Sequence, residues 1–234
     1  MSNVALPRLY APLLASLIIA MPSPSADSAT LRVAIPHPAI AAPYALLAAG
    51  KVIDAGFVRF PQWDRIRRFL LDERSFHCAE LRQWVAWATT LRTLPLRDRL
   101  TAINGRVQAR IVYASDAVVW GRRNYWEDPR EVVRKGGTDC EGFAILKMFL
   151  AIAAGIDRRE MAIVVGRIPG ENDYHAILLV RAEGHAYVLN NRQRRLLDLR
   201  YMPDFIPVYA VDTVSAWSYA APAPSVEARA VGLP

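Results

Sequence analysis

Apolar residues recur at helical spacing through the first half of the chain. Between Gln62 and Leu71, and again between Glu80 and Leu94, they return every three or four positions, which predicts helices with one buried face. Pro95 cannot continue the second helix and ends it. A third helix is expected from Leu96 to Ile111, with a break or a frayed turn near Gly105, because glycine weakens a helix interior.

The middle of the chain alternates between loop and helix. Tyr113 to Trp126 is polar and aromatic without a period, which indicates a loop. A proline then begins a short helix from Pro129 to Lys135, and the pair Gly136-Gly137 ends it. Phe143 to Ala154 is strongly apolar at helical spacing, and Gly155 closes that helix.

The second half of the chain changes to β-rich runs. Met161 to Gly166 predicts a buried strand, and the runs 174–181 and 185–190 flank Glu183-Gly184, a signal for a β-hairpin. Shorter strands are expected at Leu31–Ile35, Leu196–Leu199 and Val208–Val211. Helices followed by antiparallel strands predict an α+β fold, in which the helix after Gly137 packs on the sheet and further helices precede it.

The amino terminus has the pattern of an export signal. Arg8 precedes an uncharged apolar run from Tyr10 to Met21, which is too short to span a bilayer but fits a signal-peptide core. An uncleaved anchor or a buried helix is the competing interpretation. We therefore expect a signal peptide at residues 1–28, a segment of uncertain type at 29–59, the main domain at 60–219 and an Ala- and Pro-rich, loosely ordered tail at 220–234.

Composition limits the classes of function. The chain has 234 residues, of which 53% are hydrophobic and 22% charged, as expected for one folded domain. The formal net charge of +7 raises the possibility of a nucleic-acid partner. The arginines are scattered and no aromatic stripe accompanies them, so a solvated basic surface is the better interpretation and no nucleic acid is expected.

The cysteines and histidines exclude a structural zinc site of ordinary spacing. The chain has two cysteines, Cys78 and Cys140, and four dispersed histidines. In an exported protein two cysteines would normally suggest a disulfide. The residues around Cys140 point to a different role for that thiol, and Cys78 is then expected to be a buried free thiol, with an intermolecular disulfide as the alternative.

Cys140 is expected in the first turn of a helix. Thr138 and Glu141 have the spacing of a capping box, in which each side chain bonds the other's backbone amide. Unpaired amides and the positive end of the helix dipole would stabilise a thiolate there and lower its pKa. The alternative is that Cys140 only packs as a small buried side chain.

The predicted hairpin places a histidine beside an amide. If Glu183-Gly184 forms the turn, His175 lies opposite Arg192 and diagonal to Asn190 on one face. Diagonal neighbours are about 7–8 Å apart at the backbone, within reach of a hydrogen bond between side chains. A helix-starting cysteine next to this hairpin would complete a nucleophile, a base and a group that orients the base.

Four motifs together resemble a known family. They are Tyr125-Trp-Glu-Asp-Pro129, Gly136-Gly-Thr-Asp-Cys-Glu141, Tyr174-His-Ala176 and Tyr187-Val-Leu-Asn-Asn191. From about Phe60 to Tyr219 the chain is similar to the bacterial transglutaminase-like cysteine proteinases, which include the LapG-type periplasmic proteases that trim large surface adhesins. The resemblance implies a papain/transglutaminase-like core, a periplasmic location, an exported or surface protein as substrate, and an inner-membrane regulatory receptor as a further partner.

The resemblance also implies roles for single residues. Cys140 matches the nucleophile and His175 the base, whereas Asn190 stands where the family usually has an aspartate. An asparagine can orient the imidazole through its carbonyl oxygen, but it cannot neutralise an imidazolium. We therefore expect a Cys–His–Asn site with weaker turnover than an aspartate version.

Calcium is the cofactor that the resemblance suggests. Asp139 and Glu141 match acidic residues that help to bind calcium in LapG-type members, and the aspartate that often follows is replaced here by Gly142. Calcium takes six to eight oxygen ligands, so two carboxylates make a weak site. Helix capping is the competing role for Glu141.

The expected reaction is peptide hydrolysis through an acyl-enzyme. Cys140 attacks a carbonyl, amides at the helix start hold the oxyanion, and His175 protonates the leaving amine. Trp126 and Tyr174 are expected to wall the substrate groove. Transglutaminase or deamidase chemistry on glutamine is one alternative, and a weakly active or inactive binding scaffold, suggested by Asn190 and Gly142, is another.

Overall fold

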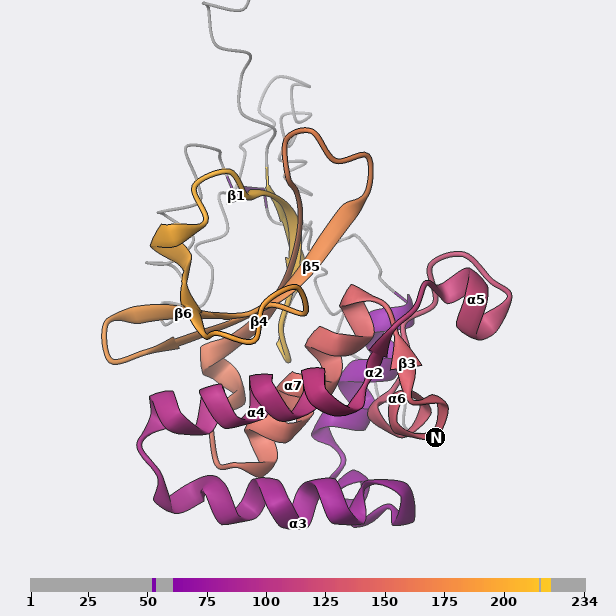
Figure 1. The fold of residues 1–234 in the computed structure, drawn as a ribbon, viewed down its shortest axis with the longest axis vertical. Helices are drawn as coiled ribbons and strands as arrows, with labels where there is room; N and C mark the ends of the chain where they lie inside the picture. Colours follow the sequence, from indigo (N-terminus) through magenta and orange to yellow (C-terminus); the bar gives the residue numbers. More distant parts are fainter. Residues whose placement is uncertain (1–51, 54–60, 215, 220–234) are drawn as a thin grey trace, which may run out of the picture. The chain divides into compact units, whose positions relative to one another are not determined.

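A computed structural model describes residues 52–53, 61–214 and 216–219 (Figure 1). The predicted signal peptide, the strand expected at Leu31–Ile35 and the tail at 220–234 lie outside these residues. Within them, helices precede an antiparallel sheet, as the sequence predicts. None of the helices in this part of the chain combines the length and the apolar character needed to cross a membrane.

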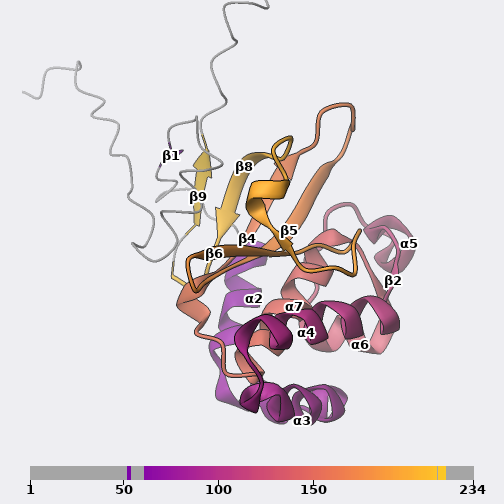
Figure 2. The ribbon, with the colours of Figure 1, turned by 60° about the vertical axis from the view of Figure 1, so that its left-hand side comes forward.

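Six α-helices and several 3-10 turns make up the helical part of the described chain. The helices are α2 (Pro61–Leu71), α3 (Arg82–Thr90), α4 (Leu96–Arg110), α5 (Asp116–Trp120), α6 (Pro129–Lys135) and α7 (Cys140–Ala153). The 3-10 turns are η1 (Glu73–His77), η2 (Ala79–Leu81), η3 (Leu91–Thr93), η4 (Arg158–Glu160) and η5 (Leu199–Tyr201). Helices α3 and α4 both pack against α7, and α4 also bonds the segment 190–193 through Asn104 and Gln108 (Figures 1 and 2).

Three sequence predictions about the helices need correction. The helix expected from Glu80 to Leu94 is divided, with 3-10 turns on both sides of α3. Helix α4 shows no break at Gly105, because that position faces open space while Ile103 and Val107 hold the helix in the core. The loop expected at Tyr113–Trp126 contains helix α5.

The strands form one seven-stranded antiparallel sheet and a separate two-stranded ladder. The large sheet has the order β1-β9-β8-β4-β5-β6-β7. Its strands are β1 (Val52–Ile53), β4 (Met161–Arg167), β5 (Tyr174–Ala182), β6 (His185–Leu189), β7 (Leu197–Asp198), β8 (Ile206–Val211) and β9 (Ala216–Tyr219). The ladder pairs β2 (Val112–Tyr113) in parallel with β3 (Gly137–Thr138). The four predicted strand regions of residues 161–211 are confirmed, whereas β1, β9 and the ladder were not predicted.

The hairpin of β5 and β6 has the predicted register. Leu178 pairs with Leu189 and Ala182 pairs with His185, so the turn falls on Glu183-Gly184. Both turn residues have positive φ, 54° and 74°, as a two-residue type I′ turn requires. The register therefore carries the start of β5 and the residues after β6 to the same end of the sheet.

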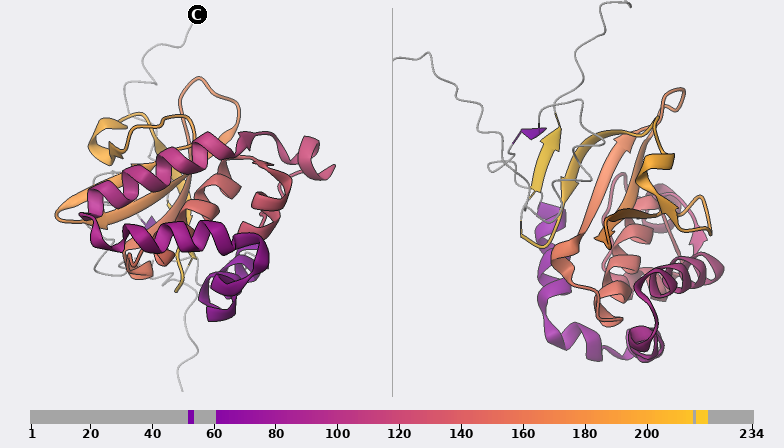
Figure 3. Two further views of the ribbon diagram at one scale, coloured as in Figure 1. Left: turned by 60° about the horizontal axis from the view of Figure 1, so that its bottom comes forward. Right: turned by 90° about the vertical axis from the view of Figure 1, so that its left-hand side faces the viewer.

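Helix α7 is enclosed by protein along its length. Twelve of its fourteen residues are buried. One side packs on the sheet face that carries Ala176, Leu178 and Val180, and the other helices cover the rest (Figure 3). The opposite sheet face has its own apolar cluster, closed by Leu199 and Phe205. This enclosure fixes the first residue of α7, Cys140, at the end of the sheet where β5 begins.

Candidate active site

Asp139 caps the helix that carries Cys140. Its Oδ1 accepts hydrogen bonds from the backbone amides of Glu141 and Gly142, at 3.2 and 3.4 Å. The predicted capping box is therefore wrong: Thr138 lies in strand β3, and the chain turns into the helix one residue later. Cys140 is the first residue of α7, as the sequence indicated.

The Cys140 thiol is buried among acidic groups. Only 8% of the residue is exposed, and its Sγ donates a hydrogen bond to Oε2 of Glu141 at 2.9 Å. Burial is the main cause that raises the pKa of the thiol, and the charges of Glu141 and Asp139 raise it further. The expectation of a lowered pKa is wrong in these surroundings, because burial and then the two carboxylates raise the pKa of the thiol.

His175 and Asn190 form the hydrogen bond that the hairpin register predicted. His175 Nε2 lies 2.9 Å from Oδ1 of Asn190, and the backbone amide of Arg192 donates to the same oxygen at 2.9 Å. An amide oxygen only accepts, so Nε2 must carry the proton and Nδ1 is left as the acceptor. Burial lowers the pKa of His175, while the bond to Asn190 opposes that change. Burial thus favours a neutral imidazole, and no described residue forms a hydrogen bond with its Nδ1.

The thiol and the imidazole belong to contacting elements. The backbone amide of Ala176, the residue after His175, hydrogen-bonds to Cys140 and lowers the pKa of its thiol slightly against the larger causes. Within the described residues, the hydrogen bond that Cys140 donates goes to Glu141 and not to His175. The structure thus places Cys140 against the strand that carries His175, while the thiol hydrogen-bonds to a neighbouring carboxylate.

An ion pair that the sequence did not reveal supports Asn190. The guanidinium of Arg192 binds the carboxylate of Glu171 through two hydrogen bonds, of 2.6 and 2.7 Å. Gln108 of α4 donates to the backbone oxygen of Asn190. The hairpin register placed Arg192 opposite His175, but Glu171 lies in the loop before β5, and no sequence pattern signals its partner.

Three carboxylates form a cluster beside Cys140. One oxygen each of Asp116, Glu127 and Asp139 lie within 4.8 Å of one another. Burial, followed by the charges of neighbouring carboxylates such as Glu141, raises the pKa of Asp139 to about 9. Burial is also the main cause that raises the pKa of Glu127 to about 7. Such mutual repulsion is relieved by a cation.

The donor set of this cluster fits a divalent cation of the calcium type. Oδ1 of Asp116 is buried and has no hydrogen-bond donor among the described residues. Oxygen ligands with several carboxylates are what calcium prefers. Of the two predicted metal residues, Asp139 belongs to the cluster, while the carboxylate of Glu141 accepts the hydrogen bond of the Cys140 thiol. Sequence reasoning missed Asp116 and Glu127, because the fold alone brings them to Asp139.

Crowding around position 142 explains why a glycine, and not an aspartate, follows Glu141. A Cβ built at this position would lie 1.8 Å from Oγ1 of Thr138 and 3.0 Å from Oε2 of Glu127. No side chain fits there without displacing the Thr138 side chain. The Glu127 carboxylate lies against the space that a side chain at position 142 would enter, so it supplies an acidic group there.

A pocket of about 640 Å³ opens on the thiol. Cys140, Tyr174 and Tyr209 are among the residues that line it. Tyr174 is half exposed and lines this pocket, so it stays the predicted wall of the substrate groove. Trp126 does not wall the pocket: it is buried and packs edge-on against Trp63, with ring centroids 6.0 Å apart.

Cys78 is a free thiol, as predicted. Full burial was expected, but the residue is only half-buried. Its Sγ lies 3.8 Å from the backbone oxygen of Arg74. Its position in the turn between η1 and η2 explains the partial exposure.

Comparisons with known proteins give one family match and several similar folds. Residues 74–217 match the profile of the family described as bacterial transglutaminase-like cysteine proteinase. The fold is similar to calcium-bound LapG from Legionella pneumophila, with a TM-score of 0.54 and 23% identity over 70% of this chain and 92% of LapG. Another LapG structure from the same organism gives a TM-score of 0.53 and 23% identity over 66% and 86% of the two chains. No protein with a curated description matches the chain.

Proposed function

Because the chain belongs to the bacterial transglutaminase-like cysteine proteinases, we propose that it hydrolyses a peptide bond of an exported or surface protein through Cys140, His175 and Asn190. One observation carries this proposal. His175 is fixed by Asn190 with Nδ1 left as an acceptor, and the next residue of the same strand hydrogen-bonds to Cys140.

The reaction begins when the thiol turns from Glu141 towards His175. Nδ1 takes the proton, and the thiolate attacks the substrate carbonyl. The backbone amide of Cys140, at the first position of α7, has no partner within the helix and donates to the oxyanion. The imidazolium then gives its proton to the leaving amine, and the peptide bond breaks to leave a thioester.

Water completes the cycle. His175 takes a proton from the water, hydroxide adds to the thioester, and the sulfur leaves as the carboxylic product forms. Asn190 keeps the ring in one orientation through both steps, since its oxygen accepts from Nε2 throughout. It adds no negative charge, so the imidazolium is less stabilised than it would be beside an aspartate.

Calcium is the proposed cofactor, held by Asp116, Glu127 and Asp139. Two observations support this assignment: the carboxylate oxygens lie close together, and the buried Oδ1 of Asp116 has no hydrogen-bond donor among the described residues. A bound calcium ion would supply positive charge beside Cys140 and so favour the thiolate. The structural relative that was solved with calcium is consistent with this proposal.

The proposed location is the periplasm, reached through the amino-terminal signal. The apolar run from Tyr10 to Met21 behind Arg8 supports export. An inner-membrane regulatory receptor is proposed as the second protein partner, by analogy with the family.

The decisive experiment compares cleavage by the wild-type protein with that by variants. Purified wild-type protein, Cys140→Ala and His175→Ala are incubated with a cell-surface protein fraction and calcium, and the new termini are identified by mass spectrometry. Cleavage by the wild-type protein alone supports the proposal, provided that circular dichroism shows all three to be folded. Full activity of Cys140→Ala contradicts it.

Two further readouts separate the alternative functions. Addition of a primary amine reveals transglutaminase chemistry if the amine becomes attached to glutamine side chains without chain cleavage. A thiol-directed active-site probe that leaves Cys140 unlabelled at neutral pH, with calcium present, would favour an inactive scaffold.

A further inference from the structure

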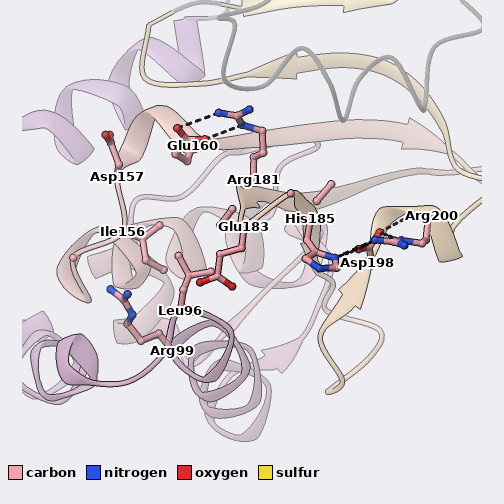
Figure 4. Close-up of a pocket in the computed structure, with 14 residues that line it drawn as sticks. Leu96, Arg99, Ile156, Asp157, Glu160, Arg181, Glu183, His185, Asp198 and Arg200 are labelled. Atoms are coloured by element: carbon pink, nitrogen blue, oxygen red, sulfur yellow. Dashed lines mark hydrogen bonds and ion pairs between the residues drawn. The ribbon is translucent and has the colours of Figure 1, made fainter.

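A second binding region lies at the opposite end of the β5–β6 hairpin from Cys140. Two pockets, of about 480 and 500 Å³, share His185, Asp198 and Arg200 there. Figure 4 shows the residues that line the first of them. Strand β5 has nine residues, which is about 30 Å at the usual rise per residue. The region is therefore distinct from the thiol pocket.

The residues shared by the two pockets, called the ridge residues here, are His185, Asp198 and Arg200, and hydrogen bonds join them. Asp198 accepts from His185 Nδ1 at 2.8 Å and from Arg200 Nε at 2.9 Å (Figure 4). These hydrogen bonds, that of Arg200 first, lower the pKa of Asp198 to about 2. Asp198 is thus already satisfied, and its charge is not available to other arginines.

Two arginines line the outer pocket together with Asp198, whose carboxylate is already hydrogen-bonded to His185 and Arg200. Arg97 of α4 and Arg195 of the segment before β7 both line this pocket. Neither side chain forms an ion pair or a hydrogen bond with any residue that the structure describes. The charge of Arg97 reaches Tyr187 in the same pocket, where it opposes the burial that raises the pKa of that phenol. Like charges on one concave surface attract an anion.

The inner pocket has a different character. Leu96 and Ile156 provide apolar surface in it, and the ion pair of Arg181 with Glu160, at 3.0 Å, forms one wall (Figure 4). The outer pocket, which adjoins it at the ridge residues, carries the positive charges of Arg97 and Arg195. An anionic group and an apolar side chain placed side by side therefore match the two pockets better than a free inorganic anion does.

We infer that this region, named here the ridge site (Arg97, Arg195, Leu96, Ile156 and the ridge residues), binds an acidic segment of a partner protein with an apolar residue next to its carboxylates. The carboxylates bind Arg97 and Arg195, and the apolar side chain packs on Leu96 and Ile156. Both arginines are exposed, so each contact alone contributes modestly, and reversing both charges is expected to weaken binding at least about tenfold.

The test uses full-length Cys140→Ala and a short fluorescein-labelled peptide in which two glutamates precede a leucine. Fluorescence anisotropy should show saturable binding, weakened at least about tenfold in an added Arg97→Glu/Arg195→Glu pair. The control pair is Arg82→Glu/Arg134→Glu, which makes the same change of net charge at two exposed arginines elsewhere. Control-pair binding should stay close to that of the parent.

Three results would overturn the inference. One is equal weakening by the control pair, which would mean attraction to net charge alone. Another is unchanged binding of a peptide with glutamine in place of both glutamates, or with serine in place of leucine. The third is full displacement by millimolar inorganic phosphate, which would indicate a site for small anions. Because Cys140→Ala is used throughout, the result is independent of hydrolysis.

Discussion

Arg192 and Glu171 are joined by two parallel hydrogen bonds, of 2.6 and 2.7 Å, next to the pair of His175 and Asn190. The backbone amide of Arg192 donates to the oxygen of Asn190 that also binds the imidazole. The ion pair therefore fixes the segment that orients the base, although neither side chain touches the ring in the described hydrogen bonds.

Removal of this ion pair should slow the chemical step. In Arg192→Ala the backbone amide can still donate to Asn190, but Glu171 no longer holds the segment that carries it. The imidazole is then oriented less well, and kcat should fall by up to about tenfold, the rate equivalent of about 1.4 kcal/mol. KM should change little, and Arg192→Lys should restore part of the rate. Steady-state kinetics on a cleaved peptide measure both constants. Arg159→Ala, which breaks the exposed pair with Asp157, is the control; an equal loss there would contradict a positioning role.

Glu141→Gln should make Cys140 more reactive without calcium. The charge of Glu141 is one of the causes that raise the pKa of the thiol, so its removal lowers that pKa and increases the thiolate fraction at a given pH. The rate of alkylation by iodoacetamide at pH 7 should increase several-fold. Asp173→Asn, at another carboxylate of the same pocket, should leave the rate nearly unchanged. An unchanged rate in Glu141→Gln would show that burial alone controls the thiol.

Calcium should oppose the loss of stability at rising pH. Without metal, the raised pKa of Glu127, about 7, and of Asp139, about 9, means that the folded state binds protons which the unfolded state releases near pH 4–5. The free energy of unfolding should therefore decrease as pH rises from about 5 to 8. Calcium at about 100 times its Kd should add about 2.7 kcal/mol at pH 8.

Thermal unfolding in EGTA and in calcium measures this effect. Asp116→Asn should abolish most of the calcium-induced increase in Tm, and magnesium should substitute poorly because the ions demand different geometry. An increase of equal size in Asp116→Asn would place the ion elsewhere.

Lys147→Met should stabilise the fold. Lys147 is fully buried in α7, and its Nζ has no hydrogen-bond partner among the described residues. Burial lowers the pKa of its ammonium group to about 7. Between pH 7 and about 10 the unfolded state binds a proton that the folded state lacks, so wild-type stability gains with rising pH through this group.

Differential scanning calorimetry tests the prediction. At pH 6 the Tm of Lys147→Met should exceed that of the wild type by at least about 3 °C. The part of the pH dependence between 7 and 10 that Lys147 causes should vanish. Lys135→Met, at an exposed position, should change neither quantity. A lower Tm for Lys147→Met would show that the ammonium group has an unseen partner.

Local patterns were enough to predict the elements that position the base. The Glu183-Gly184 turn fixes the pairing of β5 with β6, and from that pairing the contact between His175 and Asn190 follows. The start of α7 was predicted from similar local signals, although the capping residue was Asp139 and not Thr138.

Long-range contacts could not be predicted in this way. Asp116 and Glu127 meet Asp139 only because α5 forms in a stretch without helical period, and because the β2–β3 ladder draws that stretch to the start of α7. The raised pKa of Cys140 likewise follows from the folded surroundings, first from burial and then from the charges of Glu141 and Asp139. A helix end considered alone predicts the opposite direction, since it omits the carboxylates that the fold assembles around the sulfur.

The two-residue hairpin tip controls geometry that lies a whole strand away. Side chains along a strand alternate between its two faces, so one extra residue at Glu183-Gly184 would slide β6 by a single step against β5. Asn190 would then be carried past the imidazole and turned to the other face. Length variation at this exposed tip is consequently as harmful to the proposed chemistry as a substitution beside the sulfur.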